Sequence, residues 1–131
     1  TDMDIAESIK AHNKSCKAIS MTVYKPVGRF GAVEIDPITN EVKSFMEKPD
    51  GQGNWINAGF FVCEPEVFDY LPEDADNIMF EKTPFENFVK NNEMHAFKHR
   101  GFWKPMDMLR DNQELEKMWV ENKAPWKKWE D

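Results

Sequence analysis

A single α/β domain is the fold that the sequence predicts, and three observations support it. Strand-like and helix-like patterns alternate along the 131 residues, without an internal repeat or a flexible linker. Hydrophobic residues make up 40% of the chain, which is enough to build a buried core. No apolar run approaches the roughly 20 residues that a membrane-spanning helix needs.

The first half of the chain predicts one helix followed by four strands. Asp4 is suited to be a helix N-cap, and Glu7 stands three positions later, so a helix is expected over residues 4–13. The strands are expected at 17–24, 30–36, 41–47 and 55–63. The second and third strands flank a turn and should form a hairpin, and the fourth is the most hydrophobic run and should be buried.

The second half predicts two helices, a strand and a final long helix. Pro65 opens a short helix. The sequence Thr-Pro-Phe-Glu at 83–86 is typical of a helix start, with Thr as the N-cap and Pro in the first position. A strand is expected at 94–99, and residues 107–121 form the strongest amphipathic pattern.

Charge and cysteine content exclude several functions. The net charge is −7, which argues against a nucleic-acid binder but leaves room for a few local cations that hold a phosphorylated ligand. Cys16 and Cys63 form no CxxC motif, so neither a disulfide scaffold nor a zinc site is indicated. The chain opens on polar, acidic residues without a signal peptide, so we expect a cytoplasmic protein without a membrane partner.

Charged residues and glycines at strand ends are the candidate site residues. Lys48, held beside Pro49, could contact a phosphate, and Glu47 could bind sugar hydroxyls; an ordinary solvated strand end is the alternative. The glycines around Arg29 favour a turn over an anion site. Within 55–63, Gly59 indicates either close approach of a ligand or tight packing against a helix.

Other candidates have simple structural explanations. Asp107 precedes the last helix and could ligate a divalent metal or serve as an N-cap. The three histidines, at positions 12, 95 and 99, have no carboxylate at ligand spacing and are interpreted as structural or surface residues. No catalytic triad, phosphate-binding P-loop or GxGxxG motif can be assembled.

Taken together in order, five motifs resemble the glucose-1-phosphate cytidylyltransferases, bacterial enzymes that make CDP-glucose from CTP and glucose 1-phosphate. The motifs are GRFGAVEID, FMEKP, GNWINAGFFVCEPEVFD, AFKHRGFWKPMDMLRD and APWKKWE, and they run along essentially the whole chain. The family's Gly-rich GxGTRL loop and its first metal-binding Asp have no counterpart here. The resemblance therefore implies the C-terminal, sugar-binding half of a Rossmann-like nucleotidyltransferase, with a mixed sheet and flanking helices.

The resemblance also implies roles for individual residues. Lys48 would contact the phosphate of glucose 1-phosphate, Glu47 would hold sugar hydroxyls, and Asp107 would ligate Mg²⁺. The remaining pocket residues implied by the resemblance are Gly31, Asn57, Gly59, Arg29, Trp103 and Lys104. As one domain (1–105 the sugar-binding part, 106–131 a helix and Trp-rich tail), the chain alone is expected to be inactive. CTP would be bound only with the other half, and a homo-oligomer is expected.

A non-catalytic module is the alternative interpretation. Such a module would bind sugar phosphates or assemble with a partner, without transferring a nucleotide.

Overall fold

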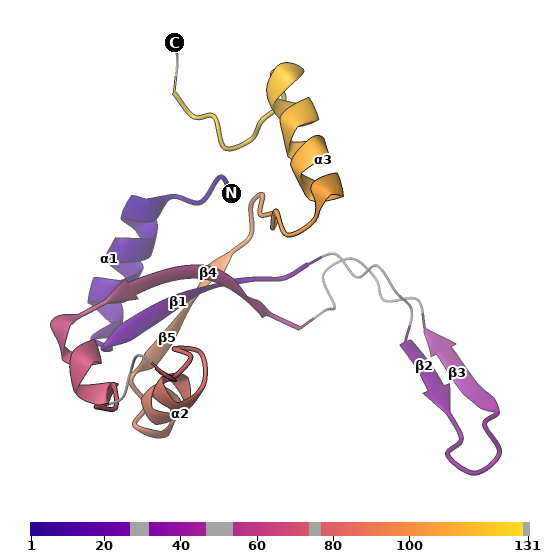
Figure 1. Ribbon diagram of the computed structural model, residues 1–131, viewed down its shortest axis with the longest axis horizontal. Helices are drawn as coiled ribbons and strands as arrows, with labels where there is room; N and C mark the ends of the chain where they lie inside the picture. The colour runs from indigo at the N-terminus through magenta and orange to yellow at the C-terminus, as the bar shows by residue number, and fades with distance from the viewer. Residues whose placement is uncertain (27–31, 47–53, 74–76, 130–131) are drawn as a thin grey trace.

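Strand β1, Ile19–Tyr24, is the central strand of a three-stranded sheet (Figure 1). It pairs antiparallel with β4, Ile56–Cys63, and parallel with β5, Met94–His99, so the sheet is mixed. This arrangement confirms the α/β class that the sequence predicted. This computed structural model describes residues 1–26, 32–46, 54–73 and 77–129.

Helix α1, Ile5–Ser15, lies on one face of the sheet and contacts it through polar side chains. Its buried residues are Ser8 and His12, whereas the apolar residues Ile5 and Ile9 are exposed. The facing residues of β1 are polar as well, as Ser20 illustrates. The contact between α1 and β1 is therefore polar and hydrogen-bonded rather than hydrophobic.

The hydrophobic core lies on the opposite face of the sheet. Two short elements cover it, the 3-10 helix η1 (Pro65–Tyr70) and helix α2 (Thr83–Lys90). Ile19 and Phe88 are fully buried at its centre. The other members are Ala18, Val67, Phe61, Tyr70, Phe80, Phe85 and Met94. Phe61, Phe80 and Phe85 pack edge to face, an arrangement that favours one relative orientation of their rings.

Helix capping follows the sequence prediction at one helix and departs from it at another. The Asp4 carboxylate accepts a hydrogen bond from the Glu7 N–H at 3.0 Å, which confirms the predicted N-cap of α1. At α2 the N-cap is Lys82, and Thr83 is already helical and makes no capping hydrogen bond, so that prediction was wrong. Pro84 at the start of α2 removes a backbone donor that would otherwise need a partner.

Strand β4 forms where the sequence predicted it, but the prediction that it is buried was wrong. Only Ala58 within it is buried, and Phe60 is 41% exposed. The cause is its position at the edge of the sheet, where much of its length lacks a covering layer. Apolar side chains of β4 therefore include solvent-exposed ones, such as Phe60, as well as ones that pack in the core, such as Phe61.

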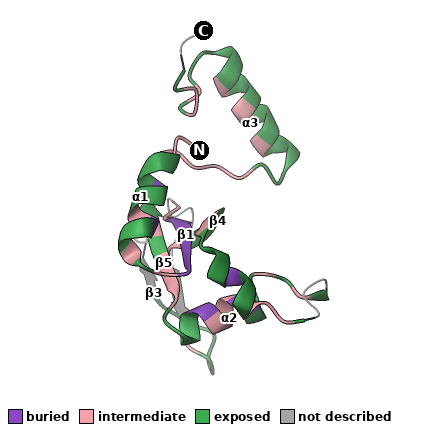
Figure 2. Cartoon of the chain, turned by 90° about the vertical axis from the view of Figure 1, so that its left-hand side faces the viewer, coloured by how far each residue is buried: buried purple, intermediate pink, exposed green. Residues whose placement is uncertain are grey.

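Helix α3, Leu109–Val120, buries none of its residues (Figure 2). Within the amphipathic stripe predicted for it, Leu115 and Met118 are half-buried, while Leu109 and Trp119 are exposed. Trp119 lies beside Trp129 of the tail, with ring centroids 6.3 Å apart. The apolar face of α3 is thus largely open to solvent.

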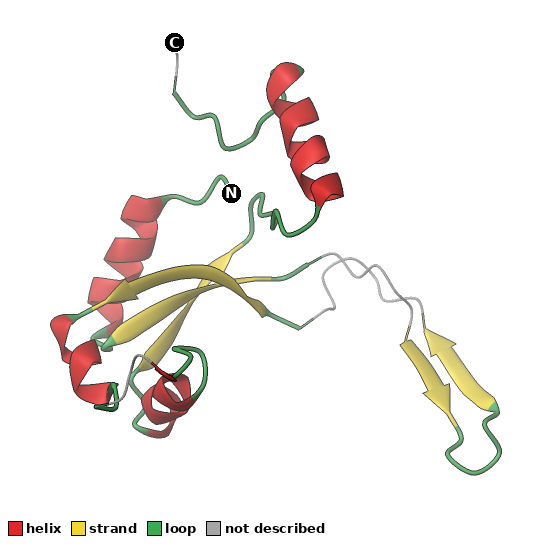
Figure 3. Ribbon diagram, in the orientation of Figure 1, coloured by secondary structure: helices red, strands yellow, loops and turns green. Residues whose placement is uncertain are grey.

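The predicted hairpin is confirmed as β2, Ala32–Ile35, and β3, Val42–Met46 (Figure 3). Asp36 organises its turn by accepting backbone hydrogen bonds from Ile38 at 2.9 Å and Thr39 at 3.0 Å. These bonds, led by that from Thr39, together with Lys43, lower the pKa of Asp36 from its usual 3.8 to about 2.

The described ranges contain no helix that is long and apolar enough to cross a membrane. Cys16 and Cys63 are both free, exposed thiols.

Candidate functional site

The carboxyl ends of the parallel strands β1 and β5 lie at the same edge of the sheet (Figure 1). In open α/β sheets, ligands bind beyond the carboxyl ends of the strands. Tyr24, at the end of β1, pairs with the first residue of β4 at this edge. In the sequence, residues 27–31 come shortly after β1 and residues 47–53 shortly before β4. We therefore take this edge as the candidate site.

Four of the predicted site residues cannot be placed. Arg29, Gly31, Glu47 and Lys48 lie outside the residues that the structure describes. Their expected roles at a sugar phosphate therefore stay predictions.

Asn57 and Gly59 form an irregular segment of β4 at this edge. The pairing register with β1 shifts between Met21 and Val23, and Gly59 has a φ of +81°. The Gly59 N–H donates to the Asn57 side-chain oxygen at 2.8 Å. No described atom lies within 4 Å of a Cβ built on Gly59, so the alternative of tight packing against a helix was wrong, and the glycine serves the backbone conformation.

Trp103 is brought directly against this segment. Its indole N–H donates to the Ala58 carbonyl at 3.0 Å, and its ring lies 5.2 Å from that of Tyr24. A predicted site residue thus supports the strand that carries two others.

The chain's first residues are tied to the loop after β5. The Phe102 N–H donates to the Asp2 carboxylate at 2.7 Å, and the Asp2 N–H donates to the Phe102 carbonyl at 3.1 Å. His99, 8% exposed, places its Nε2 3.1 Å from the same Asp2 carboxylate. No local pattern indicates this cluster, because Asp2 lies about a hundred residues before His99 and Phe102 in the chain.

The Lys104 side chain forms ion pairs with acidic residues of α3. Its ammonium bonds the Glu114 carboxylate and lies 3.6 Å from Asp111, and its side chain is 14% exposed. Lys104 first and Arg110 second lower the pKa of Glu114. The predicted pocket role of Lys104 therefore competes with a structural role in holding α3.

Asp107 is exposed immediately before α3. The N-cap of α3 is Met108, so the alternative that Asp107 caps the helix was wrong. No hydrogen bond or ion pair with another described residue engages the Asp107 carboxylate, whereas the nearby Asp111 bonds the Met108 N–H at 3.2 Å. The described residues include no group of three acidic, His or Cys side chains suited to a metal.

Three cations surround Trp55 at the same edge, and the sequence interpretation missed them. They are Lys25, Lys98 and Arg100, at 5.9, 5.6 and 5.8 Å from the indole ring. Their positions in the sequence could have indicated them, because each lies at or just beyond the carboxyl end of a parallel strand.

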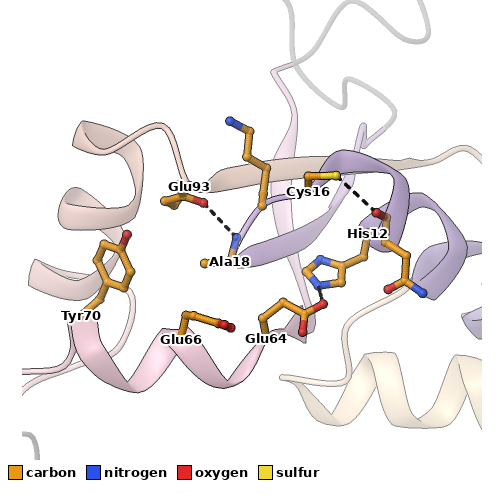
Figure 4. Close-up of a pocket in the computed structure, with 9 residues that line it drawn as sticks. His12, Cys16, Ala18, Glu64, Glu66, Tyr70 and Glu93 are labelled. Atoms are coloured by element: carbon orange, nitrogen blue, oxygen red, sulfur yellow. Dashed lines mark hydrogen bonds and ion pairs between the residues drawn. The ribbon is translucent and has the colours of Figure 1, made fainter.

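A second candidate lies at the opposite edge of the sheet, as a hollow of about 380 Å³ (Figure 4). Glu64, Glu66 and Glu93 line it, together with His12 and Tyr70. Among the described residues, Lys17 is the one Lys or Arg side chain in this lining, and three carboxylates outweigh its charge, so the hollow disfavours a phosphorylated ligand.

The histidines beside this hollow are structural, as the sequence interpretation held. His12 Nε2 donates to Glu64 at 3.2 Å, because a carboxylate can only accept, and His12 Nδ1 lies 2.8 Å from the Ser20 hydroxyl. The Ser20 hydroxyl is also within hydrogen-bonding distance of His95 Nδ1, at 3.1 Å. The order of acid, His and Ser resembles a nucleophilic triad, but Ser20 is only 2% exposed and no substrate can reach it.

Comparisons with known proteins agree with this architecture. A family model described as nucleotidyl transferase matches residues 1–131. The glucose-1-phosphate cytidylyltransferase of Salmonella typhi is 45% identical over 129 residues, which cover 98% of this chain and 49% of that enzyme. The mannose-1-phosphate guanyltransferase of Saccharomyces cerevisiae is 31% identical over 82% of this chain and 30% of that enzyme.

The fold has a counterpart among solved structures. A crystal structure of a "Putative Glucose-1-Phosphate Thymidylyltransferase" from Bacillus anthracis, in complex with sucrose, superposes with a TM-score of 0.59. It is 14% identical, and the match covers 98% of this chain and 51% of that one. The chain thus spans about half the length of its closely matching relatives, and it belongs to the nucleotidyl transferase family.

Proposed function

We propose that this chain is the sugar-phosphate-binding part of a glucose-1-phosphate cytidylyltransferase. The observation that carries the proposal is the 45% identity to the Salmonella typhi enzyme along 98% of the chain. The complete enzyme would transfer CMP from CTP to glucose 1-phosphate and release pyrophosphate. The open edge of the sheet, with its nearby cations, is compatible with a phosphorylated sugar.

In this reaction a phosphate oxygen of glucose 1-phosphate attacks the α-phosphorus of CTP, and the bond to pyrophosphate breaks. No covalent enzyme intermediate is needed, so the protein contributes positioning and charge neutralisation. Lys48 would contact the sugar phosphate and Glu47 the sugar hydroxyls. Asn57 and Gly59 would line the sugar from β4, which Trp103 holds in place through the Ala58 carbonyl.

Mg²⁺ would neutralise phosphate charge in the complete enzyme. Asp107 fits such an ion, because its carboxylate is exposed and no described side chain engages it. Mg²⁺ commonly takes only one or two protein carboxylates and fills its remaining positions with water and phosphate oxygens. Asp107 alone could therefore supply this chain's protein ligand to the ion.

The chain alone would bind sugar phosphate without turning it over. None of its residues match the Gly-rich GxGTRL loop, which the resemblance assigns to CTP. We expect the assembled enzyme to be a cytoplasmic homo-oligomer.

Two assays of the 131-residue chain test this function. Saturation-transfer NMR should detect glucose 1-phosphate but not glucose, because the phosphate supplies the charge-assisted contacts. Incubation with CTP, glucose 1-phosphate and Mg²⁺ should give no CDP-glucose. Equal binding of glucose and glucose 1-phosphate would refute a phosphate-dependent site. CDP-glucose formation above a mock preparation would refute the proposal that the chain alone binds the sugar phosphate without turning it over.

A further inference from the structure

The pairing register gathers four side chains at the candidate edge. Tyr24 ends β1 and pairs with the first residue of β4 and with the last residue of β5. The next residues outward are Lys25, Trp55 and Arg100, so they lie in one row across the three strands. Lys98 stands two residues before Arg100 and so projects from the same face of β5. We call these four residues the Trp55 cluster.

The cluster holds three positive charges around one indole. Lys98 Nζ, Arg100 Cζ and Lys25 Nζ lie 5.6, 5.8 and 5.9 Å from the ring centroid of Trp55. The negative face of an aromatic ring attracts a cation, but one uncharged ring cannot neutralise three of them. Three positive charges therefore lie within 5.9 Å of one ring centroid.

No acidic residue among the described ranges lies within ion-pair distance of these cations. The chain carries 24 acidic and 17 basic residues, so acidic partners are abundant. Other basic side chains use them, and ion pairs between described residues engage Lys43, Lys104, Arg110, Lys117 and Lys123. Because no carboxylate of residues 1–26, 32–46, 54–73 or 77–129 pairs with the Trp55 cluster, these cations remain available to an external anion.

We propose that the Trp55 cluster binds a phosphate group that carries at least two negative charges. A guanidinium matches the geometry of phosphate oxygens, and two ammonium groups add charge without fixing direction. The group can belong to a phosphate monoester or to a diphosphate. The proposal rests on the geometry of the cluster and holds whether or not the chain serves a cytidylyltransferase.

Calorimetric titration of the 131-residue chain with pyrophosphate, at low salt and without divalent cations, tests the proposal. Lys98→Gln and Arg100→Gln should each raise the Kd about tenfold, the effect of one lost charge-assisted contact. Lys90→Gln, on the exposed end of α2, removes the same charge away from the edge and should leave the Kd unchanged. All three substituted side chains are exposed, so folding should be preserved.

The indole N–H resonance of Trp55, assigned with Trp55→Phe, reports the location of binding and should shift with pyrophosphate. Parallel titrations with glucose 1-phosphate and with inorganic phosphate separate a monoester from a diphosphate ligand. Loss of affinity in Lys90→Gln equal to that in Arg100→Gln would overturn the proposal, as would a Trp55 resonance that does not move. If Lys48→Ala abolishes glucose 1-phosphate binding and the cluster variants do not weaken it or pyrophosphate, the proposed function stands and this inference fails.

Discussion

Gly59 adopts a φ of +81° inside β4, a conformation that residues with a Cβ rarely adopt. No described atom blocks a side chain there, so the cost of substitution comes from the backbone alone. Gly59→Ala should lower the free energy of unfolding by about 1–2 kcal/mol, measured by urea denaturation. Gly59→Asn should cost less, because asparagine tolerates left-handed conformations.

Gly101 provides the contrasting case. A Cβ there would collide with the Asp2 carboxylate and with His99, so Gly101→Ala should disturb the tie between the chain start and the loop after β5. If Gly59→Ala were as stable as the parent, the conformational explanation for the glycine in β4 would be wrong.

Lys48, the cation that the family resemblance places at the sugar phosphate, should be the main determinant of glucose 1-phosphate binding. A charge-assisted contact with phosphate contributes roughly 1.5–3 kcal/mol, so Lys48→Ala should weaken binding by roughly 10- to 150-fold. Glu47→Gln should cost less, because only hydroxyl contacts change. Ligand-observed NMR titrations would measure both effects.

Lys43 supplies the control for that experiment. It belongs to β3 and pairs with Asp36 at 3.1 Å, in the turn region of the hairpin. Lys43→Ala removes the same charge and should leave affinity unchanged. Equal affinity of Lys48→Ala and the parent would remove Lys48 from the site.

At the scale of elements, the hairpin turn should depend on pH through Asp36. Its pKa falls from 3.8 to about 2 on folding, since its charged form accepts backbone hydrogen bonds from Thr39 and Ile38. The stabilisation is therefore complete above about pH 3.8 and is lost as the pH falls through about 2. NMR titration of the Thr39 amide should show a midpoint near pH 2, and Asp36→Asn should remove that transition. A midpoint at or above 3.8 would contradict the turn geometry.

Most elements could be predicted because their signals are local. The Asp4 cap, the hairpin turn and the alternating pattern of β5 each depend on residues a few positions apart. The failures have a tertiary cause. Burial of β4 depends on its place at the sheet edge, and the start of α2 depends on Lys82, whose backbone rather than side chain begins the helix.

The same distinction applies to the candidate site. The sequence predicted Trp103, Asn57 and Gly59, and the structure brings them together through the Ala58 carbonyl. The sequence analysis did not predict the hydrogen bonds between Asp2 and Phe102, nor the three cations around Trp55. Those contacts depend on strand order and register, which local patterns do not encode.

At the scale of the whole molecule, exposed apolar surface should drive self-association. Leu109 and Val120 of α3 are 74% and 70% exposed, and Trp129 of the tail is 55% exposed. Large apolar side chains that are this exposed are common at interaction faces. Sedimentation velocity should show the 131-residue chain associating as its concentration rises.

Substitutions on α3 locate this association. Leu109→Glu and Val120→Glu should shift the equilibrium toward monomer. Ile38→Glu, which is 89% exposed in the hairpin turn, should not shift it. A monomer at every workable concentration would show that the exposed face of α3 does not bind a second copy.

The central claim is that a phosphorylated sugar binds at the carboxyl edge of β1 and β5. Amide chemical-shift mapping of the 131-residue chain during titration with glucose 1-phosphate tests it most directly. We expect saturable shifts in Asn57, Lys98 and Arg100, and no shift around Glu66 in the hollow at the opposite edge. Shifts confined to that hollow, or equal shifts with glucose, would contradict it.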